Sequence, residues 1–141
     1  MSVRTLFVYG TLRPSSRHPM AHRLRAGAKP LGTGTARGTL YDFGYYPGAT
    51  FDGEARGRVV GEVFAVPTAS QLIAELDYYE GAPPHGDGEL YRLVEIEVLL
   101  DTGPMLRAMT YALKRPPLWA RPVPSGDWIV HTRARTARKL R

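Results

Sequence analysis

Glycine and proline divide this chain into short segments, and they limit its possible folds more than any other feature of the sequence. Fifteen glycines and twelve prolines are spread over 141 residues. Glycine favours turns, and proline lacks the amide proton that helices and strand ladders require, so both residues tend to end regular structure. We therefore expect short strands and turns, packed into a single domain around one core.

The apolar patterns between these breaks predict an α+β fold. Alternating or β-branched runs indicate strands, whereas the spacing of apolar residues in two other segments indicates short helices. Because strands outnumber helices, we expect a small barrel or a curled sheet. The expected strands are 4–9, 35–43, 57–66, 90–100 and 105–113, and the expected helices are 19–26 and 69–80.

Several features depart from these regular patterns. The segment 44–53 is rich in glycine, tyrosine and proline and is expected to be a loop, and four prolines exclude a regular ladder from 115–124. The glycine-rich segment 32–34 lacks the strand-to-helix context of a dinucleotide-binding loop, so we interpret it as a turn. In the strand expected at 57–66, Glu62 interrupts an otherwise apolar face.

The absence of cysteine excludes several classes of chemistry. Without cysteine the chain has no disulfides, no thiolate nucleophile and no cysteine-ligated zinc. His18 and His22 lie four residues apart, but no third ligand is suggested nearby, so we expect no metal site. The apolar run at 6–9 is too short for a signal-peptide core, and no window approaches a membrane span. We therefore expect a cytoplasmic protein without membrane contact.

The net charge of +6 is concentrated at the C-terminal end. Residues 131–141 carry five arginines and lysines and no acidic residue, and without these charges the net charge falls to +1. A short basic end of this kind is usually solvated. We therefore expect a domain at 1–130 and a basic tail at 131–141. Nucleic-acid binding is not favoured, because residues 1–130 show no basic stripe with interleaved aromatics.

The helix expected at 69–80 contains an unusual carboxylate. Thr68 and Gln71 form a capping-box pattern at its start. When each residue advances about 100° around the axis, Glu80 falls in the same apolar sector as Leu72 and Leu76. A carboxylate on a buried stripe costs free energy unless it is paired or hydrogen-bonded.

Two physical effects would raise the pKa of Glu80 and suit it to acid/base work. Burial disfavours its charged form, and the helix dipole is unfavourable to an anion in the last turn. In the alternative interpretation, the end of the helix frays and Glu80 reaches solvent. Both interpretations remain open on geometry alone.

Four fragments occur in order along the chain: Val8-Tyr9-Gly10-Thr11-Leu12, Leu76-Asp77-Tyr78-Tyr79-Glu80-Gly81, Tyr91-Arg92-Leu93-Val94 and Ser125-Gly126-Asp127-Trp128. Taken together, they resemble the γ-glutamyl cyclotransferase-like family, in particular the branch of γ-glutamylamine cyclotransferase and the AIG2-like proteins. The resemblance covers about residues 4–129. A Tyr-Gly-Thr-Leu tetrapeptide is weak evidence alone, but a Leu-Asp-x-x-Glu-Gly about seventy residues later makes the combination fairly specific.

The resemblance implies a small mixed β-barrel with flanking short helices and a reaction without metal or cofactor. In that reaction a γ-glutamyl group, carried by an amine or another conjugate, cyclises to 5-oxoproline and releases the amine. The family's acid/base glutamate falls on Glu80 and its substrate-binding loop on Tyr9, Gly10, Thr11 and Leu12. We also place Tyr91 and Tyr46 at the substrate, although ordinary packing and a structural turn are their alternatives. Asp127-Trp128 is interpreted as an anchor for the C-terminal segment.

Three other functions remain open. A non-catalytic member of the same fold would bind a small carboxylated ligand without turnover. A hydrolase would use water instead of the internal amine and would release glutamate rather than 5-oxoproline. A third possibility is that the basic tail binds a nucleic acid or an acidic partner, in which case binding would fall steeply with salt.

Overall fold

The computed structural model of the chain describes residues 3–10, 13, 19–42, 47–69, 71–80 and 91–139, and for residues 77–80 and 137–139 it describes the backbone alone. Seven strands and three helices lie in these ranges. None of the helices in this part of the chain combines the length and the apolar character that crossing a lipid bilayer requires.

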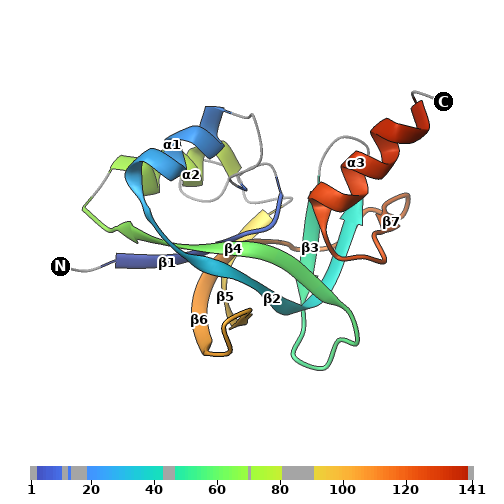
Figure 1. Cartoon of the computed structure of the whole chain (residues 1–141), viewed down its shortest axis with the longest axis horizontal. Coiled ribbons are helices and arrows are strands. Elements are labelled where there is room, and N and C mark those ends of the chain that lie inside the picture. The colour runs from blue at the N-terminus through green and yellow to red at the C-terminus, as the bar shows by residue number, and fades with distance from the viewer. Residues whose placement is uncertain are drawn as a thin grey trace.

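Five strands form a closed mixed β-barrel (Figure 1). The order around the barrel is β2-β4-β1-β6-β5, and β5 pairs back with β2. β1 runs parallel to β6, whereas the other pairs are antiparallel. The barrel and its flanking helices confirm the fold expected from the resemblance. The strands are β1 (Val3–Val8), β2 (Lys29–Asp42), β4 (Arg58–Pro67), β5 (Tyr91–Leu100) and β6 (Met105–Leu113).

The barrel closes at a glycine of β2. Gly34 pairs with Leu100 of β5, and a Cβ added to Gly34 would lie 2.6 Å from the carbonyl oxygen of Leu99. Only a residue without a side chain allows this close approach of the two backbones. The interpretation of 32–34 as a turn is therefore wrong: these residues belong to β2, which shifts register between Pro30 and Gly32.

Two apolar clusters hold the fold together. Several strands bury side chains on both of their faces, so one cluster lies on each side of them. The cluster inside the barrel includes Phe7, Val59, Val63, Val98 and Trp128. The other cluster lies between the barrel and two helices, α1 (Pro19–Gly27) and α2 (Gln71–Glu80), which lie over β1 and β4 (Figure 1). It includes Leu6, Val8, Leu24, Phe64, Leu72 and Leu76.

The two helices confirm most of what the sequence predicted for them. α1 matches the expected helix at 19–26. α2 begins at Gln71, two residues later than expected, and the predicted capping box with Thr68 stays a prediction. The predicted apolar stripe is confirmed at Leu72 and Leu76, which have no solvent-exposed area.

Two short strands lie in segments that were expected to be irregular. β3 (Pro47–Phe51) falls within the predicted loop 44–53 and pairs with the second half of β2. β7 (Arg121–Pro122) lies in the proline-rich segment and pairs with the last two residues of β2. Both strands therefore extend the sheet from β2, outside the closed barrel.

The C-terminal segment forms α3 (Trp128–Lys139), and the boundary expected at residue 130 falls inside this helix. Trp128 at its start packs into the barrel core and is 6% exposed. His131 and Arg135 lie 2.6 Å and 3.0 Å from the carboxylate of Asp42, at the end of β2. In Figure 1 α3 lies at the opposite end of the sheet from α1 and α2.

We expect Gly34→Ala to lower the free energy of unfolding by about 1–3 kcal/mol, because the new methyl group would force β2 and β5 apart. Gly53→Ala is the matched control: a Cβ at Gly53 would have no atom within 4 Å, and a surface change of this kind alters stability by about 0.5 kcal/mol or less. Urea denaturation measures both. Equal stability of the two variants would contradict the role of Gly34 in closing the barrel.

Candidate active site

The first predicted site residue, Tyr9, fixes the end of β1 to two other strands. Its side chain is buried, with 7% of its area exposed. The hydroxyl group donates to the carbonyl oxygen of Tyr111 at 2.5 Å and accepts from the amide of Ala49 at 3.2 Å. Because Tyr111 belongs to β6 and Ala49 to β3, one side chain connects three strands. Tyr9 is thus part of the framework of the site, and a direct contact with substrate stays a prediction.

Two further predicted residues, Gly10 and Tyr91, converge on Pro47 at the start of β3. The hydroxyl of Tyr91 donates to the carbonyl oxygen of Pro47 at 2.6 Å. A Cβ added to Gly10 would lie 2.5 Å from Cγ of the Pro47 ring. The structure therefore brings together residues that lie far apart in the sequence, and Gly10 permits a close contact with Pro47. β3, which the sequence did not predict, forms the meeting point.

Other predicted residues lie outside the part of the chain that the structure describes. Thr11, Leu12 and Tyr46 are in this group. Glu80 is the last residue of α2, and the structure describes its backbone but not its side chain. The roles assigned to these four residues therefore stay predictions.

The helix that leads to Glu80 is fixed along both its apolar and its polar side. Leu72 and Leu76 are fully buried against the barrel. Glu75, predicted at the edge of the apolar sector, forms an ion pair with Arg23 of α1 at 3.0 Å. The backbone of α2 is thus held by packing up to the last turn, which ends at Glu80.

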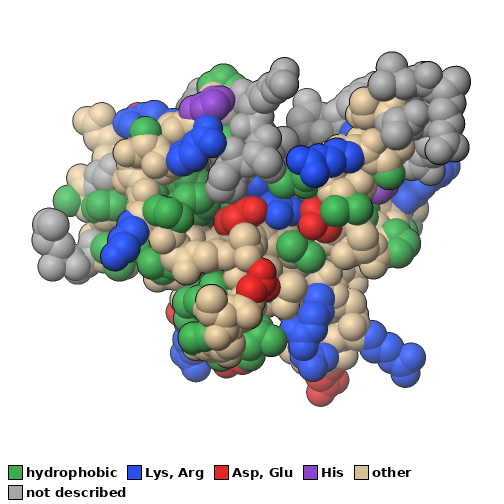
Figure 2. Space-filling view, in the orientation of Figure 1, with side chains coloured by type: hydrophobic (Ala, Val, Ile, Leu, Met, Phe, Trp, Pro, Cys, Tyr) green, Lys and Arg blue, Asp and Glu red, His purple; other side chains and the backbone are tan. Residues whose placement is uncertain are grey.

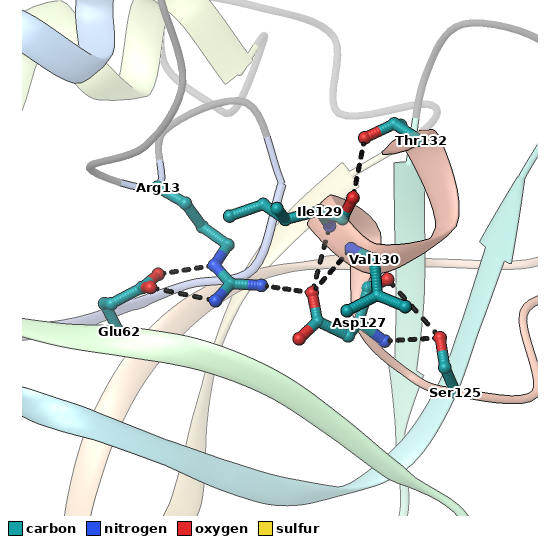
Figure 3. Close-up of polar contacts among 7 residues, drawn as sticks. All are labelled: Arg13, Glu62, Ser125, Asp127, Ile129, Val130 and Thr132. Carbon is teal, nitrogen blue, oxygen red and sulfur yellow. Dashed lines mark hydrogen bonds and ion pairs between the residues drawn. The ribbon is translucent and has the colours of Figure 1, made fainter. Parts of the chain in front are cut away.

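A buried cluster of charged side chains around Arg13 escaped the sequence analysis. Arg13, with 6% of its area exposed, lies between Glu62 of β4 and Asp127, which precedes α3 (Figure 3). Its Nε and Nη2 donate to the two carboxylate oxygens of Glu62 at 2.6 Å and 2.9 Å. Its Nη1 donates to Oδ1 of Asp127 at 2.7 Å. In Figure 2 basic atoms between two acidic groups are visible near the middle of this face.

Arg13 keeps its charge in this buried position. Burial alone would lower the pKa of its guanidinium group, but the hydrogen bonds and charges of Glu62 and Asp127 outweigh this effect and raise the pKa above its usual value. Since the usual value is already far above neutral, Arg13 stays protonated at physiological pH. Its contribution to stability is therefore constant through the neutral range.

Asp127 has a second function at the start of α3. Its Oδ1 also accepts from the amides of Ile129 at 3.0 Å and Val130 at 3.2 Å, which makes it the N-cap of the helix. The preceding carbonyl oxygen, of Gly126, accepts from the amide of Val60 in β4 at 2.8 Å. These bonds confirm the interpretation of Asp127-Trp128 as an anchor. The sequence signal for the cluster was Glu62, the polar exception on an apolar strand face.

Within the described ranges, no three or more histidines, aspartates and glutamates lie close enough together to bind a metal ion.

The chain belongs to the γ-glutamyl cyclotransferase, AIG2-like family, because the model of this family matches residues 6–130. The match begins within β1 and ends in the first turn of α3, so it includes the barrel except for the first three residues of β1, and it includes the Tyr9–Gly10 segment. None of the curated proteins compared with the chain matches it.

Several solved structures have a fold similar to that of this chain. YkqA from Bacillus subtilis is 26% identical with a TM-score of 0.73; the match covers 96% of this chain but 43% of YkqA, so this chain spans less than half of that protein. The uncharacterized protein PH0828 from Pyrococcus horikoshii is 27% identical with a TM-score of 0.67, covering 95% and 97%. An AIG2-like protein from Mus musculus is 22% identical with a TM-score of 0.67, covering 84% and 83%, and it supports the fold alone.

We expect Tyr9→Phe to destabilise the protein by about 1–3 kcal/mol, because a buried carbonyl group and a buried amide would each lose the hydrogen bond to the Tyr9 hydroxyl. Tyr91→Phe removes the hydrogen bond to Pro47 at a less buried position and is expected to cost about 1 kcal/mol. Thermal and urea unfolding measure the difference. A Tyr9→Phe variant as stable as the wild type would show that the hydroxyl does not hold the three strands together.

Proposed function

We propose that this protein is a γ-glutamyl cyclotransferase that converts a γ-glutamyl-amine or a related γ-glutamyl conjugate to 5-oxoproline and a free amine. The observation that carries the proposal is the family match over residues 6–130, which includes both the Tyr9–Leu12 segment and Glu80. The proposal includes a small-molecule substrate, a cytoplasmic location and no added cofactor.

In the proposed reaction the substrate supplies its own nucleophile. Glu80 takes a proton from the α-ammonium group, whose pKa is about 8, so a carboxylate base has only a modest gap to bridge. The freed α-amine attacks the γ-carbonyl carbon, forming the ring C–N bond. The tetrahedral intermediate then breaks its bond to the leaving nitrogen, to which Glu80 returns the proton. The ring nitrogen gives up its second proton to the released amine, which leaves as an ammonium ion. The atoms balance without water, and the products are 5-oxoproline and the amine.

The enzyme's main contribution would be geometric and electrostatic. Ring closure is intramolecular, so holding a near-attack conformation provides much of the acceleration. The developing oxyanion needs fixed donors, and we assign this role to backbone amides of Gly10, Thr11 and Leu12. The convergence of Tyr9, Gly10 and Tyr91 on β3 supports the proposal, since it fixes Gly10, the first of these residues, against β3.

We expect Glu80→Gln to reduce the release of 5-oxoproline by about 10²–10⁴-fold, the usual contribution of general acid/base catalysis. The assay would use a panel of γ-glutamyl amines and γ-glutamyl peptides, with product identified by mass spectrometry. Glutamate as the product would instead indicate hydrolysis, and binding without turnover would indicate a non-catalytic member of the family.

Glu75→Gln is the matched control, because it makes the same change on the same helix at a half-exposed ion pair with Arg23. It is expected to keep wild-type turnover. Equal turnover by folded Glu80→Gln would remove Glu80 from the mechanism.

A further inference from the structure

We propose that Glu62 and Arg13 form a clasp that fixes Gly10 and Arg13 to each other and to β4, and that this clasp positions the backbone amide of Gly10 as a donor in the reaction. The inference rests on the proposed function for its catalytic part. Its structural part, the fixing of Gly10 and Arg13, stands on the contacts of described residues alone. Arg13 is then a positioning residue rather than a catalytic one.

The first observation is that the chain contacts Glu62 at two positions, Val8 and Arg13. Val8, the last residue of β1, pairs with Glu62 in the antiparallel ladder between β1 and β4. Arg13, five positions later, returns to Glu62 and binds both of its carboxylate oxygens. The chain therefore contacts Glu62 first through a backbone pairing and then through a forked ion pair. The two parallel bonds of this ion pair fix orientation as well as distance.

The second observation is a hydrogen bond between Gly10 and Arg13. The amide of Arg13 donates to the carbonyl oxygen of Gly10 at 3.1 Å, an i to i+3 bond of the kind that β-turns contain. Gly10 in turn lies against the ring of Pro47 at a distance that allows no side chain. Gly10 and Arg13 are thus fixed to each other, to β3 and to β4.

The third observation is that Asp127 attaches the clasp to α3. The same Oδ1 atom accepts from Arg13 and from the amides of Ile129 and Val130 (Figure 3). The positive end of the helix dipole offsets part of the second carboxylate charge, so two acids and one arginine can share a buried site. A displacement of the start of α3 would therefore be transmitted to Arg13 through a single atom, Oδ1 of Asp127.

Arg13 is poorly suited to bind the substrate's carboxylate directly. Its side chain is buried, and all three of its nitrogens are engaged by Glu62 or Asp127. A buried ion pair adds little net stability compared with apolar side chains of similar volume, so fixed geometry is the better explanation for its presence. Backbone donors for an oxyanion require such fixed geometry, since a displacement of about 1 Å can cost about 100-fold in rate.

The test uses three variants that conserve size. Arg13→Lys keeps the charge but replaces the fork with a single point of contact. Glu62→Gln removes the charge and one acceptor oxygen. Asp127→Asn keeps an oxygen that can cap α3 but removes the ion pair, so protection of the Ile129 amide should persist while the clasp weakens.

Two readouts are measured on each folded variant. The first is the hydrogen-exchange rate of the Arg13 amide, which reports the bond to Gly10 directly; we expect it to rise about tenfold or more in Arg13→Lys and Glu62→Gln. The second is the steady-state release of 5-oxoproline; we expect kcat to fall by about 100-fold while KM changes little, because the donors act in the transition state.

Arg107→Lys and Glu95→Gln are the matched controls. They make the same chemical changes in an exposed ion pair, 3.3 Å long, between β5 and β6. Both are expected to keep wild-type exchange and turnover.

The outcomes separate this inference from the proposed function. Variants that lose thermal stability but keep wild-type Arg13 exchange and kcat would overturn the clasp and leave a purely structural ion pair. If the wild-type protein releases no 5-oxoproline from any compound, the proposed function fails. The exchange rate of the amide at position 13 then tests the clasp by itself. Faster exchange in the variants than in the wild type supports the clasp, and unchanged exchange refutes it.

Discussion

Strand β2 is the element on which the rest of the structure depends, because four other strands pair with it along its 14 residues. Its first part follows β4, its middle joins β5 at Gly34, and its last part joins β3 and then β7. Closing the barrel at Gly34 removes the exposed strand edges that an open sheet would present. Beyond the barrel, Asp42 at the end of β2 holds α3 through His131 and Arg135.

The candidate site depends on this closure, since its described residues come from strands that only the barrel brings together. Tyr9 and Tyr91 both bind backbone groups of β3, which is itself placed by β2. Arg13 adds a charged contact to β4 and α3. Among the described residues, no buried side-chain nitrogen or oxygen lacks a hydrogen-bond partner. Such a fully satisfied polar network is rigid, which suits a site that must hold donors in place.

Much of the fold could be predicted from the sequence because it follows local periodicity. In β5 the apolar residues alternate with the exposed Glu95 and Glu97, and α2 buries Leu72 and Leu76 on the predicted stripe. The failures have physical causes. β3 is short and contains glycine and proline, so its sequence gave no strand signal. It is stabilised by pairing with β2. α3 has a polar sequence, and its attachment relies on Trp128 and on contacts with the distant Asp42.

The sequence by itself determined the secondary structure of the periodic segments, the family, and the residues Tyr9, Gly10, Glu80 and Tyr91 as candidates for chemistry. Only the tertiary structure decided what these and other residues contact. Glu62 was visible as a charge on an apolar face, yet its partner Arg13 lies 49 positions away, and Arg13's second partner, Asp127, is 114 positions from it. A local pattern reports which face a side chain occupies. Which distant residue meets that face depends on strand register and barrel closure, and both are properties of the whole folded chain.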